Sequence, residues 1–146
     1  MVSERRSFGS AFLRPPRALT QLENYNLSRT YLMKSYELGS VIAQRDLEIG
    51  TSKDHIIRVL MGAPQRVDAT EEACFVCPIQ IIGIGDEKIR GAQGADAFRT
   101  IQLAMQLIGI ELYVKLNPQC DKRIRWHGEA DLGFPLPESV TEFGPQ

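Results

Sequence analysis

The sequence predicts an α+β fold, in which an antiparallel β-sheet of three to four strands (a meander) packs against one long α-helix. Two observations predict the sheet. Apolar and polar residues alternate over residues 41–49, and further apolar runs, separated by turn residues, follow up to residue 84. A third observation, a helical apolar period over residues 94–116, predicts the helix.

The predicted domain spans residues 38–137, with a flexible extension before it and a short tail of residues 138–146 after it. Residues 1–37 show no sustained apolar period and contain Pro15-Pro16, so we expect them to be partly disordered or to hold a short helix that begins at Ser28. Residues 128–146 are rich in Gly and Pro, and we expect them to wrap the surface in extended form.

Each strand is bounded by turn residues. The strand at 41–49 ends at Gly50, a second strand is expected at about 55–61, and a third at 73–84. Pro78 lies inside the third strand and has no N–H to donate, which predicts a sheet edge or a bulge there. A fourth strand is expected at 122–126.

The long helix is the most apolar part of the chain. Asp96 is the expected N-cap, and the apolar residues recur at helical spacing. The predicted buried stripe consists of Phe98, Ile101, Met105, Ile108 and Leu112. A helix this apolar needs cover over most of its circumference, and the preceding strands are expected to supply it.

The composition is that of a soluble domain, since 43% of the 146 residues are hydrophobic and the net charge is −1. Residues 1–29 carry five Arg and two Glu, whereas residues 30–146 carry twelve basic and sixteen acidic residues. The balance gives no reason to expect nucleic acid or a membrane as partner. Three cysteines are too few for a disulfide scaffold, which predicts free thiols in the cytoplasm.

Cys74 and Cys77 have the C-x-x-C spacing of zinc and redox sites. No second Cys or His pair accompanies them. At an offset of three residues in a strand, the two thiols point to opposite faces. We therefore interpret them as two small strand residues, and no metal or cofactor is expected.

His127, Glu129 and Asp131 alternate, so in an extended segment their side chains share one face. Together with Asp86 and Glu87 they offer ligands for a hard metal or groups for acid–base chemistry. The alternative is that they are solvated or structural carboxylates, because Gly128 and Gly133 indicate an irregular segment.

Two further features have open interpretations. Asp86 and Glu87, followed by Arg90, suit a structural knot in which carboxylates accept hydrogen bonds from free backbone N–H groups at a helix start. Trp126 is either a surface anchor for a partner or a core residue with outward-facing neighbours. The candidate functional residues are Asp86, Glu87, Arg90, Trp126, His127, Glu129 and Asp131.

The segments CPIQI (from Cys77), GIGDE (from Gly83), the long helix and WHGEADLGFP (from Trp126) resemble a family of small uncharacterised bacterial proteins, a domain of unknown function. The resemblance covers residues 40–137. It implies a bacterial, cytoplasmic setting and a compact α+β fold, but no reaction.

Three functions are compatible with the sequence. The first is a non-enzymatic interaction protein, such as an accessory or toxin-neutralising (immunity-type) protein, which predicts a protein partner or a homo-oligomer. The second is a metal-dependent enzyme that uses the carboxylates and His127. The third is a domain that binds a small ligand in a cleft.

Overall fold

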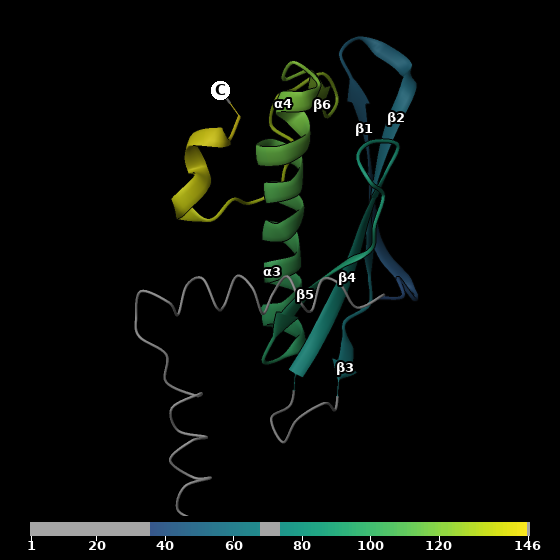
Figure 1. Ribbon diagram of the computed structural model, residues 1–146, viewed down its shortest axis with the longest axis vertical. Helices are drawn as coiled ribbons and strands as arrows, with labels where there is room; N and C mark the ends of the chain where they lie inside the picture. The colour runs from purple at the N-terminus through teal and green to yellow at the C-terminus, as the bar shows by residue number, and fades with distance from the viewer. Residues whose placement is uncertain (1–35, 68–73, 146) are drawn as a thin grey trace, which may run out of the picture. The chain divides into compact units, whose positions relative to one another are not determined.

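The computed structural model describes residues 36–67 and 74–145 (Figure 1). The predicted extension of residues 1–37 therefore lies outside the described residues, except for Tyr36 and Glu37. The elements, in chain order, are β1 (Val41–Ile49), β2 (Ser52–Gly62), β3 (Gln65–Val67), β4 (Cys74–Ile82), β5 (Arg90–Gly94), α3 (Ala97–Gly109), η1 (Ile110–Leu116), α4 (Asn117–Gln119), β6 (Ile124–Arg125) and η2 (Glu138–Phe143).

The predicted α+β fold is confirmed, with short strands added to the predicted ones. β1, β2 and β4 are antiparallel neighbours, β3 pairs with the first residues of β4, and β5 pairs with β4 as well. The chain then crosses the sheet as a helix and returns to pair β6 with the end of β1. The predicted strand at 122–126 thus exists, but only Ile124–Arg125 pair as a strand.

Pro78 lies in an interior strand and not at a sheet edge. β4 pairs with β2 from Ile79 onward and with β3 up to Val76, so Pro78 lies at the interruption between these two partner strands. At this interruption the Cys77 thiol donates to the carbonyl oxygen of Gly62, over a distance of 3.3 Å. A gap in the neighbouring ladder therefore accommodates the proline.

A continuous helical rod runs from Ala97 to Gln119 and packs on the sheet (Figure 1). Asp96 caps it as predicted, and its side chain accepts from the Arg99 N–H at 2.8 Å. The expected buried stripe is wrong at its first member, because Phe98 is 84% exposed. Thr100 and the small Ala104 are buried instead and begin the contact face.

The sheet explains why Phe98 is excluded from the contact face. A Cβ atom built on Gly94 of β5 would lie 2.6 Å from the Thr100 Oγ1 and 2.9 Å from the Thr100 N. The first turn of the helix therefore approaches β5 so closely that only small side chains fit between them. Farther along, Ile108 and Leu112 are buried as predicted.

The second half of the rod, η1, is a π-helix. The Asn117 N–H donates to the carbonyl oxygen of Leu112, five residues earlier. Three consecutive residues of this segment, Glu111, Leu112 and Tyr113, are buried. The C-terminal segment contributes to this burial, because η2 packs on η1 on the side of the rod away from the sheet (Figure 1). The tail is thus partly helical and not extended throughout.

Within the described residues, none of the helices has both the length and the apolar character that crossing a bilayer requires.

Candidate functional site

The turn between β4 and β5 holds a compact ionic cluster. Arg90 donates to both carboxylate oxygens of Asp86, at 3.0 and 2.9 Å, and its Nε lies 3.6 Å from the Glu111 Oε1. Lys115 pairs with the same Glu111 oxygen. Glu111 comes from η1 and is only 4% exposed. The cluster therefore joins the turn to the helix.

Two carboxylates in this turn accept from backbone N–H groups, as the structural-knot interpretation requires. The Gly83 N–H donates to the Glu87 Oε2 at 2.8 Å, and the Lys88 N–H donates to the Asp86 Oδ1 at 3.0 Å. The hydrogen bond from Arg90 lowers the pKa of Asp86, and the Lys88 N–H adds to the effect. Glu87 has a φ of 56°, so its side chain holds a tight turn and not a helix start.

The residues after β6 form a second group. Trp126 and Glu129 exchange backbone hydrogen bonds of 3.0 and 2.9 Å across a turn that includes His127, which is exposed. Asp131 accepts from the Tyr113 hydroxyl at 3.3 Å, and this hydroxyl in turn accepts from the Leu132 N–H at 2.7 Å. Burial raises the pKa of the Tyr113 hydroxyl, and the Asp131 carboxylate adds to the rise.

No hydrogen bond or ion pair joins the two groups within residues 36–67 and 74–145. Asp86, Glu87 and Arg90 line a cavity of about 290 Å³ beside Glu111, whereas Ala130 lines a different cavity with Tyr113. In the same ranges, no three His, Cys, Asp or Glu side chains converge in a way that could hold a metal ion. The predicted cluster is thus two separate sets of side chains in the described part of the chain.

The C-x-x-C residues lie in β4, and both thiols are free. Cys77 belongs to the hydrophobic core, while Cys74 is half-buried. Burial raises the pKa of the Cys77 thiol to about 11, so at neutral pH this side chain is a protonated, weakly reactive thiol.

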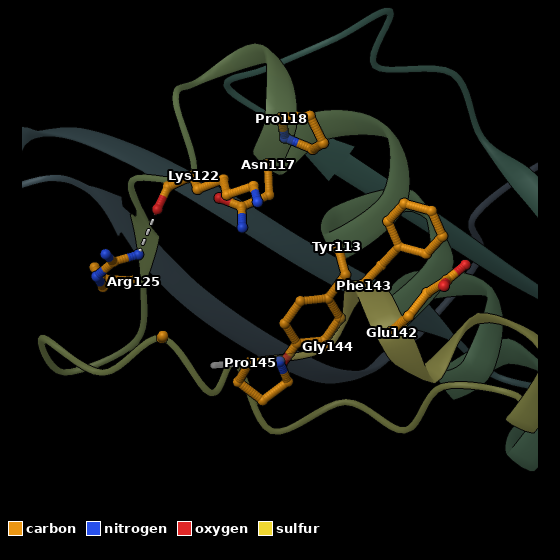
Figure 2. A pocket seen from close by; sticks show the side chains of 10 residues that line it. Tyr113, Asn117, Pro118, Lys122, Arg125, Glu142, Phe143, Gly144 and Pro145 are labelled. Carbon is orange, nitrogen blue, oxygen red and sulfur yellow. Dashed lines mark hydrogen bonds between the residues drawn. The ribbon is translucent and has the colours of Figure 1, made fainter.

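The cavity lined by Tyr113 lies between the helix and the C-terminal segment (Figure 2). Its volume is about 190 Å³, and its walls come from Tyr113 and Asn117 on one side and Phe143 and Pro145 on the other. Figure 2 also shows Arg125, whose guanidinium donates to the Lys122 carbonyl oxygen at 2.7 Å. The Arg125 side chain at this cavity is thus tied to the backbone.

A third cavity, of about 250 Å³, is an apolar groove between the helix and β1. It is lined by Ile42, Ala43, Gln44, Arg45, Val59, Met61, Ile101, Met105, Ile108 and Phe134. The only charged residue among them is Arg45. Its guanidinium carbon lies 3.9 Å from the centre of the Trp126 ring and 4.8 Å from that of Phe134. Its Nη1 donates to the Leu132 carbonyl oxygen at 2.8 Å.

Apolar side chains at or just before the groove residues of β1 and α3 are exposed. Phe98 lies one turn before Ile101 on the same side of α3 and is 84% exposed, and at the start of β1 Val41 is 47% and Ile42 51% exposed. We call the set Val41, Ile42, Phe98, Ile101 and Met105 the α3–β1 surface. Exposed apolar side chains that adjoin a groove mark binding surfaces, whereas isolated ones do not.

Sequence reasoning did not find this surface or the part that Arg45 plays in it. Arg45 interrupts the alternation of β1, because it stands at an odd position among the apolar Val41, Ala43, Leu47 and Ile49. This irregularity does not reveal its aromatic partners, which are 81 and 89 residues away in the chain. Phe98 fits the helical apolar period, so the sequence favours its burial. The signal that could have revealed its exposure is Gly94 with Thr100, small residues that indicate a close approach of helix and strand.

One protein family, described as a domain of unknown function (DUF6968), matches residues 43–136 of the chain. The match begins in β1 and ends just before η2, so it includes the sheet, the helical rod and the Arg45 stack. No curated protein and no solved structure matches the chain.

Proposed function

The chain belongs to the DUF6968 family, and we propose that it is an interaction protein that binds a protein partner through the α3–β1 surface. The observation that supports the proposal is the exposure of Phe98, at 84%, one helical turn before Ile101, which lines an apolar groove. We also propose the bacterial cytoplasm as its setting, which its free cysteines favour.

Phe98 contributes little buried area to the described fold, because 84% of it is exposed. Exposing a large aromatic side chain forgoes roughly 1.5–3 kcal/mol of burial free energy, which docking of a partner would recover. Aromatic side chains are also enriched among the residues that dominate the binding energy of protein interfaces. Phe98 is therefore the proposed anchor, with Ile101 and Met105 beside it.

The size of the groove favours a protein partner over a small ligand. Its volume of about 250 Å³ lies below the roughly 300–1,000 Å³ of typical small-molecule sites. A space of this size suits one or two apolar side chains of a docked protein. The ionic cavity beside Glu111 is of similar size, but its charged groups already bind one another.

The proposal is tested by site-specific photocrosslinking in living bacteria. A photoreactive phenylalanine analogue replaces Phe98 in the full chain, and the same analogue at the exposed Thr51, in the β1–β2 turn, is the matched control. We expect irradiation to give one discrete protein adduct from position 98 and none from position 51, with the adduct identified by mass spectrometry.

A second variant tests whether the Phe98 side chain is needed for binding in a chain that still folds. Phe98→Ser should abolish native co-purification of the crosslinked protein while the variant remains folded, because the side chain makes little contact in the free protein. If position 98 yields no adduct, or if Phe98→Ser retains the partner, the proposed function is wrong.

A further inference from the structure

One edge of the sheet is open beside the groove. Within the described ranges, β1 pairs with β2 along one side, whereas on its other side β6 covers only Glu48 and Ile49. The preceding residues, from Ile42 to Asp46, therefore present an outer edge without a neighbouring strand in the described part of the chain. We call this stretch the β1 edge. Unpaired strand edges are templates for pairing with another chain.

The side to which the unpaired backbone groups of β1 point follows from a hydrogen bond of Gly50, in the turn after β1. The Gly50 N–H donates to the Arg123 carbonyl oxygen on the β6 side, at 2.7 Å. Because the backbone groups of successive strand residues alternate between the two sides, those of Gln44 and Asp46 point to the same outer side. These two residues thus offer N–H donors and C=O acceptors to an added strand.

The groove runs along this edge. It is lined by four consecutive residues, from Ile42 to Arg45, although successive strand residues point to opposite faces. The register of β1 with β2 shifts between Val41 and Ala43, which interrupts the alternation at Ile42, and the groove contacts Ala43 to Arg45 at the edge of the strand. On the helix side, Met105 and Phe134 form the wall that alternate side chains of an added strand would meet.

The groove also has a charge preference. None of the ion pairs among the described residues involves Arg45. Its guanidinium donates one hydrogen bond to a backbone carbonyl and otherwise stacks on two rings, which leaves further N–H donors for an incoming carboxylate. Nothing else that lines the groove is charged.

We propose that the β1 edge binds an extended segment of the partner as an additional strand. The segment carries apolar side chains at alternate positions, which enter the groove, and an Asp or Glu that pairs with Arg45. This mode is strand addition, in which backbone hydrogen bonds supply affinity and the alternate side chains supply specificity. The inference rests on the proposed function and specifies the chemistry of its partner.

The test uses a displayed library of random linear peptides of roughly seven residues, about the length of a strand, selected against the full chain. We expect the enriched peptides to alternate apolar residues and to contain Asp or Glu. Binding of a synthetic enriched peptide should slow hydrogen exchange at the Gln44 and Asp46 amides, which point outward.

Two pairs of variants test the contacts by fluorescence polarisation. Gln44→Pro removes an outward N–H and should weaken binding about tenfold or more, whereas Gln44→Ala keeps the N–H and should stay within about twofold. Arg45→Met should weaken the acidic peptide about tenfold, but not its Asn or Gln counterpart. We expect Gln44→Pro to fold, because proline is tolerated at strand edges. If it does not fold, the hydrogen exchange of the Gln44 and Asp46 amides in the unaltered chain tests strand addition instead.

Three results would overturn the inference. They are a selection without enriched peptides, enriched peptides that bind Gln44→Pro as tightly as the unaltered chain, and unchanged exchange at Gln44 and Asp46. A homodimer that Gln44→Pro converts to a monomer would also overturn it, because a second copy would then occupy the edge. Adducts from position 98 together with any of these results would refute strand addition and leave the proposed function standing.

Discussion

Replacing Gly109 with alanine should destabilise the protein, although alanine is the better helix former. Gly109 lies inside the helical rod at an ordinary helical φ of −57°, so the substitution by itself favours the helix by about 0.8–1.0 kcal/mol. The added Cβ would, however, lie 2.3 Å from the carbonyl oxygen of Pro135 and 3.3 Å from its carbon. Gly109 is where the C-terminal segment crosses the helix.

The clash outweighs the propensity gain. The nearest atom belongs to the backbone, which cannot rotate away as a side chain can, so either the helix or the C-terminal segment must shift. Overpacking of this kind costs roughly 1–3 kcal/mol, and a backbone contact this short belongs at the upper end. Subtracting the helical gain leaves a net loss of about 2 kcal/mol, or a fall in Tm of about 4–8 °C for a chain of this size.

The assay is urea unfolding followed by far-UV circular dichroism, combined with hydrogen exchange at Leu136. Gly109→Ala should lower the free energy of unfolding and speed exchange in the crossing segment. Gln102→Ala is the matched control, because it changes an exposed helical residue and should stay within about 0.5 kcal/mol. An increase of about 1 kcal/mol in Gly109→Ala would refute the close crossing of helix and segment.

Three other predictions use the same protein. Phe98→Ala should change the free energy of unfolding by less than about 0.5 kcal/mol, whereas Ile108→Ala should lower it by about 2–5 kcal/mol in urea titrations; the opposite order would contradict the burial assignments. Arg90 holds the pKa of Asp86 below its ordinary 3.8, so the stabilisation is complete above about pH 4 and is lost as the pH falls through the lowered pKa. Asp86→Asn should therefore lose less stability between about pH 4 and pH 2 than the unaltered chain, and an equal loss would count against the pair. Cys77, whose pKa burial raises to about 11, should resist iodoacetamide at about pH 8 until the chain unfolds, as mass spectrometry will show; labelling at the rate of the unfolded chain would disprove its burial.

The sheet and helix could be predicted because their signals are local. The strand at residues 41–49 has the predicted bounds, and Asp96 caps the helix, since alternation and capping depend only on neighbours in the sequence. The short β3 and β5 were not predicted. Each consists of three to five residues that are held by pairing with β4, and that pairing leaves no periodic pattern of its own.

The orientation of the helix could not be read from hydrophobicity. An apolar period favours burial of the largest side chains, which selects Phe98, but the contact face is decided by how closely two backbones approach. Gly94 and Thr100 bring the first turn against β5, and the larger ring is left outside. The sequence also leaves open whether the candidate residues at 86–90 and 126–131 meet, because distances between segments of a chain are set by packing and not by spacing in the sequence.

The two ends of the helical rod differ in how much of their surface other segments bury, and this difference connects the fold to the proposed function. In η1 the consecutive Glu111, Leu112 and Tyr113 face the ionic turn, the core and the C-terminal segment, so the π-helix is enclosed on several sides. The first turn of α3 approaches β5 through Gly94 and Thr100, and Phe98 remains open to solvent. The rod is held at both ends, in η1 and where Thr100 approaches Gly94, and such preorganisation lowers the entropy that docking requires. Loosening the η1 end through Tyr113→Phe, which removes the acceptor of the Leu132 N–H, should therefore weaken partner binding at the distant Phe98 as well as lower stability.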